Sequence, residues 1–584
     1  MSSLPQFVFL PVPVSVCQGA QVLPVSVLEN VHAIIDKAIV SRPQGYRMSI
    51  DKDGVAIVAA DEAGKYYAQC TLNQIRSQAK RFGNTADFDI DDYPAIPVRG
   101  VALDMSRDRI PSMPELKKWI DRFAQWKMNI VKLYIEHTYA YKGCEDVWQD
   151  ATPFTESEIL ELKAYCAERH IMLMPEQQSF GHLHRWLRVE PYRQLAECPQ
   201  GWKCSWSMDA TDPFSLCPVD PKSLEFIDRL WSEIIPVFGT HWLGIGCDET
   251  ADLGLGRSKE ECEKIGMPRV YLNFIKKLAE LSEKHNVKAH IFADIFFLHP
   301  ELIPEVPRNL VINDWGYRPD YDFDSHAKQF HELGFDFTLQ GSNSNYTCFN
   351  GRSYRWRENC ERLVDAAVKY GALAVFSSEW GDNGHWNEPI TAIPGDAYFA
   401  AISWAPDANR NADLATALDE FVFQPGSGAG QLLLDCGKPY IHMTEPNGSD
   451  ILWLFMLDER FGLGKIEEVN VTPEKLYRIR TDLIELMPRL KRATGFIQRD
   501  RQALDSHARW MLLVADVAAE CLEHAVPSGK FLPLESRQQY AKRFDDIRIE
   551  LIRLRDDGTS RLGGRTEALD WLQYFRDNLC GTDV

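Results

Sequence analysis

The sequence predicts an α/β protein: a (β/α)8 barrel, or TIM barrel, with a small N-terminal α+β domain and a C-terminal helical domain. Three observations lead to this fold class. The chain has 584 residues, which is more than one compact core of ~100–200 residues holds. Apolar strand candidates alternate with amphipathic helices through the middle of the chain, and both ends lack this alternation. We therefore predict domains at residues 1–93, 94–423 and 424–584.

The N-terminal region combines short strands with one helix. Apolar and polar residues alternate in Tyr46–Ile50 and Gly54–Val58, which is the period of a half-buried strand. From Glu62 onward the apolar residues recur at helical spacing, as they do on one face of a helix. The prolines in Asp91–Pro97 then indicate a linker to the next domain.

The middle region carries eight strand candidates, the number found in a (β/α)8 barrel. They are Gly100–Asp104, Ile130–Ile135, Ile171–Pro175, Trp242–Gly246, Val287–Ala293, Leu310–Asn313, Asp336–Leu339 and Leu373–Phe376. We expect helices between them at Glu115–Trp126, Glu156–Glu168, Leu224–Val237, Tyr271–His285 and Arg357–Tyr370. A doubly wound sheet would also alternate, but it usually stops at about five to seven strands. The strand count therefore favours the barrel.

Beyond residue 424 the strand pattern fades. Residues 472–495, 499–523 and 534–556 are rich in Leu, Arg and Glu at helical spacing, which predicts amphipathic helices. Their charges are most simply explained as a solvated helix surface.

Composition excludes several classes of partner. The net charge of −20 disfavours nucleic acid and anionic membranes, which bind basic patches. No segment approaches the ~20 apolar residues of a membrane span. The 14 cysteines follow no regular spacing and form no CxxC pair, unlike a disulfide framework or a zinc knuckle. We expect a soluble, cytoplasmic protein with reduced thiols; its oligomeric state stays open, a homodimer included.

Polar and aromatic side chains follow the predicted strands. Barrel chemistry takes place at these carboxyl ends, and such groups need solvent or partners. Acidic residues and tryptophans at one barrel mouth are typical of a sugar pocket, because carboxylates and Arg bind hydroxyls while aromatic faces cover a pyranose. The residues in question are Asp104, Arg107, Glu136, His137, Glu176, His182, Asp248, Glu249, Asp294, Asp314, Trp315, Asn345, Tyr346, Glu379, Trp380 and Asp382.

Each of these residues alone has a simpler explanation. A single strand-end Asp is more often a helix cap than a catalyst, and a lone Trp is usually part of the core or its rim. Metal binding lacks the support of an HExxH or Cys/His spacing, and no glycine-rich nucleotide loop occurs. We expect neither a metal nor a cofactor.

The adjacent pair Asp248-Glu249 follows the fourth strand candidate. Neighbouring strand residues point to opposite faces, so both carboxyl groups can serve one ligand only where the strand breaks into its loop. Like charges and partial burial tend to raise the pKa of one carboxyl group, which suits a general acid.

At this pair the sequence resembles glycoside hydrolase family 20, the β-N-acetylhexosaminidases, whose signature is His-x-Gly-Gly-Asp-Glu. The matching stretches are Trp242-Leu-Gly-Ile-Gly-Cys-Asp-Glu-Thr, Arg99-Gly-Val-Ala-Leu-Asp-Met-Ser-Arg107, Met174-Pro-Glu-Gln-Gln-Ser-Phe-Gly-His182 and Ala63-Gly-Lys-Tyr-Tyr-Ala-Gln-Cys-Thr-Leu-Asn-Gln. Gly244 and Cys247 stand where the signature has its His and its second Gly. The chain looks like a divergent, non-secreted branch of the family.

The resemblance implies a retaining mechanism without a protein nucleophile, in which the acetamido oxygen of the substrate forms an oxazolinium intermediate. Glu249 would be the acid and base, Asp248 would hold the acetamido N–H, and Tyr346 would donate to the acetamido oxygen. Substrate-binding residues would be Arg107, Trp315, Trp380 and Asp382, with Glu136, His137, His182 and Asp294 as further pocket candidates. The expected substrate is a glycan with a terminal, non-reducing N-acetylhexosamine (GlcNAc, GalNAc or both).

Two alternatives remain open on the sequence. One is a strictly GalNAc-specific β-N-acetylgalactosaminidase. The other is a non-catalytic sugar-binding barrel, against which the intact Asp248-Glu249 pair argues.

Overall fold

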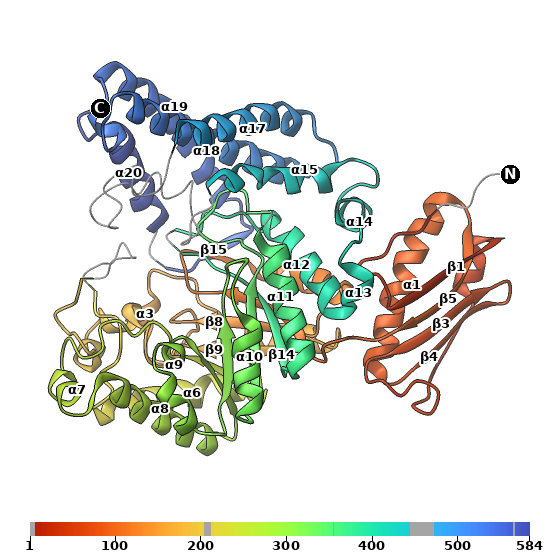
Figure 1. Cartoon of the computed structure of the whole chain (residues 1–584), viewed down its shortest axis with the longest axis horizontal. Helices are drawn as coiled ribbons and strands as arrows, with labels where there is room; N and C mark the ends of the chain where they lie inside the picture. Colours follow the sequence, from red (N-terminus) through yellow and green to blue (C-terminus); the bar gives the residue numbers. More distant parts are fainter. Residues whose placement is uncertain (1–5, 204–211, 354, 383, 444–471, 565–566) are drawn as a thin grey trace.

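The computed structural model describes the chain except for residues 1–5, 204–211, 354, 383, 444–471 and 565–566. It contains a sheet with one helix at the N-terminal side, a closed barrel in the middle, and C-terminal helices that lie along one side of the barrel (Figure 1).

The N-terminal unit is a five-stranded sheet with one helix packed on it. Its strands are β1 (Ser15–Leu23), β2 (Val31–Ile35), β3 (Tyr46–Asp51), β4 (Gly54–Ala59) and β5 (Thr85–Asp92), in the order β1-β5-β3-β4-β2. Side chains of β3 alternate between buried and exposed, as the period-two pattern predicts. Helix α1 (Glu62–Phe82) begins at Asp61, whose side chain accepts a hydrogen bond from the Gly64 N–H.

The middle region forms a closed parallel barrel of eight strands, which confirms the predicted fold class and excludes the doubly wound sheet. All eight predicted strands are present; two match the predicted bounds and the ends of the others differ by at most three residues. They are β6 (Arg99–Asp104), β8 (Ile130–Ile135), β9 (Met172–Gln177), β10 (Trp242–Gly246), β11 (Lys288–Phe292), β12 (Val311–Trp315), β13 (Phe337–Ser342) and β14 (Ala374–Glu379). Strands β12, β13 and β14 run past their predicted ends because polar residues continue the ladder there.

Helices surround the barrel. The five helices named from the sequence are α2 (Met113–Gln125), α4 (Glu156–Ala167), α6 (Pro221–Phe238), α8 (Met267–Lys284) and α11 (Arg355–Tyr370). Two further helices are α10 (Phe323–Glu332) and α12 (Pro389–Trp404). Helix α12 is buried along almost its whole length, so it lacks the polar stripe by which an amphipathic helix is recognised.

The C-terminal region is helical, as predicted. Helices α17 (Pro473–Arg492), α18 (Gln498–Glu523) and α19 (Leu534–Arg555) match the three expected segments, and α20 (Glu567–Cys580) is additional. A short strand, β15 (Ser560–Leu562), was not predicted; it pairs antiparallel with β7 (Arg109–Pro111), directly after the first barrel strand. The charges of these helices are not all solvated, because Arg499 and Arg555 form ion pairs with barrel residues.

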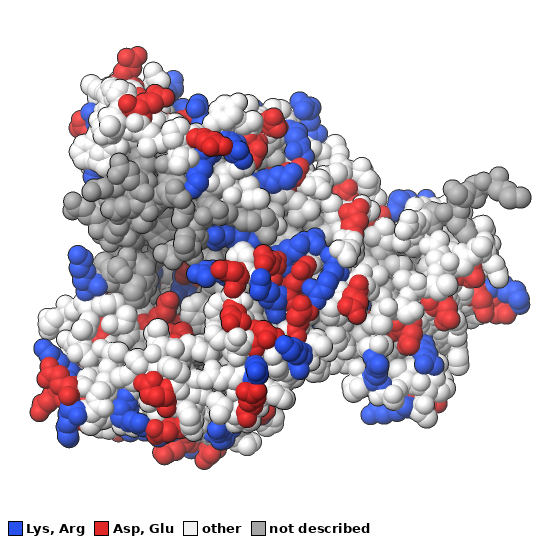
Figure 2. All heavy atoms as spheres, viewed as in Figure 1, with Lys and Arg blue, Asp and Glu red and all other residues white. Residues whose placement is uncertain are grey.

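Basic and acidic side chains are interspersed on the face of the molecule in Figure 2. Across the described ranges, no helix combines the length and apolar character needed to cross a bilayer. The 13 cysteines within those ranges all carry free thiols.

Candidate active site

The two adjoining carboxyl groups, Asp248 and Glu249, meet at one histidine. Nε2 of His182 lies 3.5 Å from Oδ2 of Asp248 and 3.3 Å from Oε2 of Glu249. Strand β10 ends at Gly246, and positive φ angles at Gly246, Cys247 and Glu249 turn the chain sharply there. This break in the strand lets both carboxyl groups face the same space, which two neighbouring residues of a regular strand could not do.

Gln178 holds Asp248 in place, a role that was not inferred from the sequence. Its Nε2 donates to Oδ1 of Asp248 at 2.9 Å, and its Oε1 accepts from the Cys247 N–H at 3.2 Å. A Cβ atom at Gly246 would lie 2.0 Å from the Gln178 side chain, so the glycine makes room for this amide. The sequence could have indicated this role, because Gln178 lies in the stretch Met174–His182 and directly follows the third strand.

One departure from the family signature, Gly244, has a local cause. A Cβ atom at Gly244 would lie 2.4 Å from Cγ of Glu176. Glu176 is buried and pairs with Lys132 at 2.5 Å, so a buried ion pair occupies the space beside position 244. Cys247 is buried too, and its carbonyl oxygen accepts a hydrogen bond of 2.8 Å from the Tyr271 hydroxyl.

Burial and neighbouring charges shift the pKa values of the site's carboxyl groups in different directions. Burial alone would lower the pKa of His182, but the charges of Asp248 and Glu249 outweigh burial and hold that pKa well above its ordinary value. Burial alone would raise the pKa of Asp248, yet His182 and Gln178 hold it below its ordinary value. Burial and the charge of Asp248 raise the pKa of Asp294 to about 7, and burial also raises the pKa values of Glu176 and Asp382.

Asp294 also supports the loop of the pair. Its Oδ2 accepts a hydrogen bond from the Glu249 N–H at 3.1 Å, while its Oδ1 is shielded from solvent and has no hydrogen-bond partner within the described residues. We expected like charge and partial burial to raise one pKa within the pair; Asp248 is not that group, because its pKa is lowered, and a raised pKa lies on this third carboxyl group.

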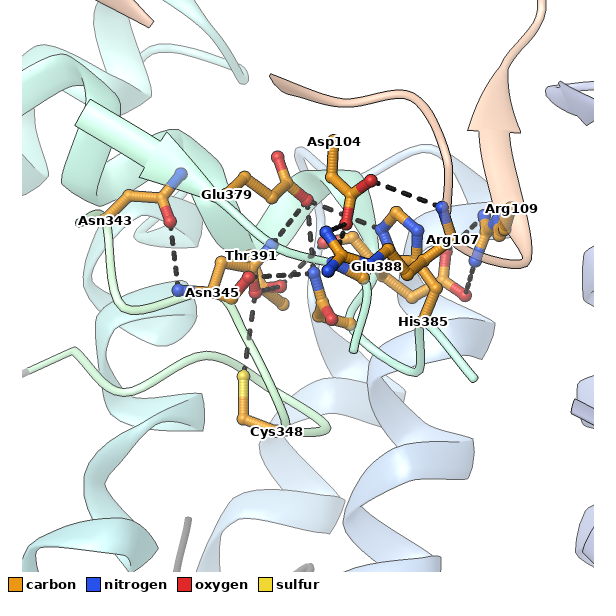
Figure 3. A network of polar contacts seen from close by, with 12 residues as sticks. Asp104, Arg107, Arg109, Asn343, Asn345, Cys348, Glu379, His385, Glu388 and Thr391 are labelled. Carbon is orange, nitrogen blue, oxygen red and sulfur yellow. Dashed lines mark hydrogen bonds and ion pairs between the residues drawn. The ribbon is translucent and has the colours of Figure 1, made fainter. Parts of the chain in front are cut away.

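Arg107 lies at the centre of a second cluster. Its guanidinium is 3.1 Å from Asp104, 3.2 Å from Glu136 and 3.9 Å from Asp382. The Gly381 N–H also donates to Asp104, so one carboxylate connects the loops after the first and the eighth strands (Figure 3). Through His182 Nδ1, 3.5 Å from Arg107 Nη2, this cluster adjoins the Asp248-Glu249 pair.

Aromatic rings line the same barrel mouth. Trp380 packs edge-on against Tyr134 with ring centroids 4.9 Å apart. Trp315 lies 5.1 Å from Tyr317, and Tyr317 lies 5.6 Å from Tyr346. The structure thus brings the predicted Trp315, Tyr346 and Trp380 together, and adds Tyr134 and Tyr317, which were not inferred from the sequence.

A buried polar network positions the loop of Tyr346. Its neighbour Asn345 donates to Glu379 at 2.9 Å and accepts from the Thr391 hydroxyl at 2.7 Å (Figure 3). Arg352 lies over the Tyr346 ring, 4.3 Å from its centroid, and donates to the Tyr346 carbonyl oxygen. The loop after the seventh strand is therefore tied to the eighth strand and its following helix.

His137 is the one pocket candidate that stands apart from these clusters. It is buried, and both ring nitrogens lack a hydrogen-bond partner within the part of the chain that the structure describes. Burial, with Arg185 and Arg188 nearby, lowers its pKa well below the ordinary value. A different histidine, His184, approaches Glu136 at 4.0 Å.

The ligand atoms of His182, Asp248 and Glu249 lie within 4.8 Å of one another, close enough to hold a metal ion. The donor set of one imidazole and two carboxylates suits zinc or another divalent cation. The absence of a metal from the reaction therefore stays a prediction, which chelation tests.

A barrel mouth with paired carboxyl groups among aromatic rings is typical of glycoside hydrolases. Residues 97–374 match the model of the glycosyl hydrolase family 20 catalytic domain, and residues 25–93 match that of domain 2 of the same family. The chain belongs to glycoside hydrolase family 20, as its motifs indicated.

Individual relatives agree with the family and with the fold. A probable beta-hexosaminidase of Arthroderma benhamiae is 24% identical over 370 residues, which cover 59% of this chain and 58% of that protein. An exo beta-N-acetylglucosaminidase of Vibrio harveyi has a similar fold with a TM-score of 0.56 at 16% identity, covering 69% of this chain and 75% of that one. The chitobiase of Flavobacterium johnsoniae, with a TM-score of 0.57 at 14% identity, covers 97% and 99%.

Sequence matches span between 30% and 58% of the lengths of three curated relatives.

Proposed function

We propose that the protein is an exo-acting β-N-acetylhexosaminidase that releases terminal GlcNAc, GalNAc or both by a retaining, substrate-assisted mechanism. The observation that carries this proposal is the Asp248-Glu249 pair, joined by His182 at a barrel mouth lined by aromatic rings. Curated relatives bear the name beta-hexosaminidase, and the Vibrio harveyi neighbour is described in complex with N-acetylglucosamine.

The two carboxyl groups differ in the way this mechanism requires. The Glu249 side chain is 43% exposed and that of Asp248 only 12%. Glu249 therefore reaches the glycosidic oxygen as general acid and then activates water as general base. Nε2 of His182 lies 3.3 Å from Oε2 of Glu249 and holds this carboxyl group at the mouth of the barrel.

Asp248 serves the acetamido group. Its lowered pKa keeps it charged, and Gln178 fixes its orientation. A fixed negative charge beside the acetamido N–H aligns the acetamido oxygen with the anomeric carbon and stabilises the positive charge that develops as the oxazolinium forms. The substrate supplies the nucleophile, an exception to the usual two-carboxylate scheme.

The remaining groups bind the sugar. Arg107 and Asp382, both members of the second cluster, bind the hydroxyls far from the scissile bond. Trp315 and Trp380 cover the apolar faces of the ring, and Tyr346 donates to the acetamido oxygen. Each of these roles needs only hydrogen bonds, charge and packing, and we propose that no metal or cofactor takes part.

The test compares aryl β-GlcNAc, β-GalNAc and plain β-glucoside substrates. Hydrolysis of the two acetamido sugars without hydrolysis of the glucoside is the expected result. Equal rates on all three would remove the substrate-assisted mechanism, and hydrolysis of the GalNAc substrate alone would establish the stricter specificity. Binding without hydrolysis of any substrate would indicate a sugar-binding barrel.

We also propose that the protein acts in the cytoplasm. The free thiols within the described ranges support this location, because secreted proteins tend to oxidise such cysteines to disulfides. Localisation of a tagged chain in its source cells, with fractionation as a control, tests the proposal.

A further inference from the structure

The residue after Arg107 has an unusual backbone and strong partners. Asp108 adopts a φ angle of 30°, a conformation that a non-glycine residue adopts only at a cost. Its side chain is buried. Because Asp108 adjoins the guanidinium-bearing residue of the sugar pocket, whatever holds this strained residue also sets the direction of the Arg107 side chain.

The C-terminal domain holds Asp108. Oδ2 of Asp108 accepts hydrogen bonds from Arg555 Nη2 at 2.9 Å and from the Ala568 N–H at 2.8 Å. The Asp108 carbonyl oxygen accepts from the Gly563 N–H at 3.0 Å. A Cβ atom at Gly563 would lie 2.8 Å from the Arg107 carbonyl oxygen, so the two backbones touch.

The same arginine reaches the loop after the eighth strand. Arg555 Nη1 donates to the His385 carbonyl oxygen at 3.2 Å, and the His385 N–H donates to the Gly381 carbonyl oxygen at 3.0 Å. Gly381 lies between the pocket residues Trp380 and Asp382, and Figure 3 shows His385 close to Arg107. One guanidinium therefore joins the loop of Arg107 to the loop of Asp382.

We propose that Arg555 is a positioning residue of the sugar pocket: the C-terminal domain sets the separation of Arg107 and Asp382, and with it the recognition of the distal sugar hydroxyls. Arg555 does not touch the sugar; it acts through Asp108 and His385. This inference rests on the proposed function, because it assumes that Arg107 and Asp382 bind sugar hydroxyls.

Domain docking alone does not require this arrangement. The C-terminal domain also forms ion pairs with the barrel away from the loops of Arg107 and Asp382. Arg561, on β15, pairs with Glu158 of α4 at 2.8 Å. The side chains of Arg555 and Arg561 are exposed to nearly the same extent, 15% and 14%. Arg561→Gln is therefore a matched control that removes a docking contact without touching Asp108 or His385.

The experiment measures kcat and KM for two substrates: an aryl β-N-acetylhexosaminide that the wild type hydrolyses, and its analogue without the hydroxyls on carbons 3 and 4. We compare wild type, Arg555→Gln, Arg555→Lys and Arg561→Gln, and record the Tm of each. Arg555→Lys keeps a cation for Asp108, but one ammonium group cannot reproduce the planar fork that reaches both loops.

For Arg555→Gln we expect kcat/KM on the full substrate to fall by about 10- to 100-fold, as small misplacements of binding groups do. The dideoxy analogue should lose little, so the preference for the hydroxylated substrate should shrink by a similar factor. Arg555→Lys should keep the wild-type Tm and still lose part of this preference. Arg561→Gln should keep the preference unchanged.

Two outcomes overturn the inference. Equal losses on both substrates in Arg555→Gln, with a lower Tm, would mean that the arginine only stabilises the docked domain. If Arg555→Lys keeps the wild-type preference for the hydroxylated substrate, the contacts of one guanidinium with both loops do not set that preference. If Arg555→Gln fails to fold, Arg555→Lys decides alone. Failure of the proposed function is distinguishable, because the wild type itself would then hydrolyse neither substrate.

Discussion

Asp294 allows a test of the electrostatics of the site that does not depend on activity. Burial and the charge of Asp248 raise its pKa to about 7, against about 3.9 in an unfolded chain. Between these values the folded protein keeps a proton that the unfolded chain has released. Raising the pH through this window therefore destabilises the folded state.

The substitution Asp294→Asn removes this ionisation. The Asn side chain can still accept the Glu249 N–H through its oxygen, as Asp294 does at 3.1 Å. The pKa difference is about three units, and each unit is worth about 1.4 kcal/mol. The variant should therefore gain stability over the wild type as the pH rises, by at most about 4 kcal/mol above pH 7.

The assay is the Tm of both proteins from pH 5 to pH 8. About two of the three pKa units fall within this pH range, so the measured gain is ~3 kcal/mol, which corresponds to roughly 5 °C for a domain as large as the barrel. The Tm difference should grow from pH 5 to pH 7 and then level off. As a control, Asp53→Asn changes an aspartate whose side chain is 77% exposed in the N-terminal domain, and its Tm difference should stay flat. A Tm difference for Asp294→Asn that does not change with pH would refute the reasoning.

Three further predictions concern the reaction. In Glu249→Gln the new side chain cannot donate a proton, so hydrolysis of a substrate with a poor leaving group should slow by ~10²–10⁴-fold, and hydrolysis of an activated aryl substrate should slow less. Equal losses of rate on both substrates, with glycosylation limiting both, would exclude Glu249 as the acid. Asp248→Asn and Tyr346→Phe should each lower kcat by ~10²–10³-fold, leave Tm nearly unchanged and weaken the binding of a thiazoline mimic of the intermediate. Wild-type values in Tyr346→Phe would transfer the role of Tyr346 to another residue, such as Tyr317. Wild-type values in Asp248→Asn would refute the assignment of the whole active site. Chelators should leave activity unchanged, and a loss that a divalent ion restores would assign a metal to the His182-Asp248-Glu249 group.

Local patterns in the sequence determined most of the barrel. Each predicted strand and helix is a run of residues whose period reflects its own burial, so neighbouring residues suffice to identify it. The pattern failed for α12, because a helix buried on all sides has no polar face, and for β15, because three residues are too few to show a period.

The sequence also indicated Asp248 and Glu249 as the catalytic candidates, since the pair is contiguous and lies in a recognisable motif. Their meeting at His182 required only that the third and fourth strands be neighbours, which holds in the barrel.

The tertiary structure alone decided how the site is held together and charged. The pKa of Asp294 is raised because the group is buried and lies near the charge of Asp248, and burial depends on every element that packs around it. Arg555 reaches Asp108 across 447 residues of sequence. No local pattern encodes such a contact, because it exists only once the barrel has closed and the C-terminal helices have packed against it.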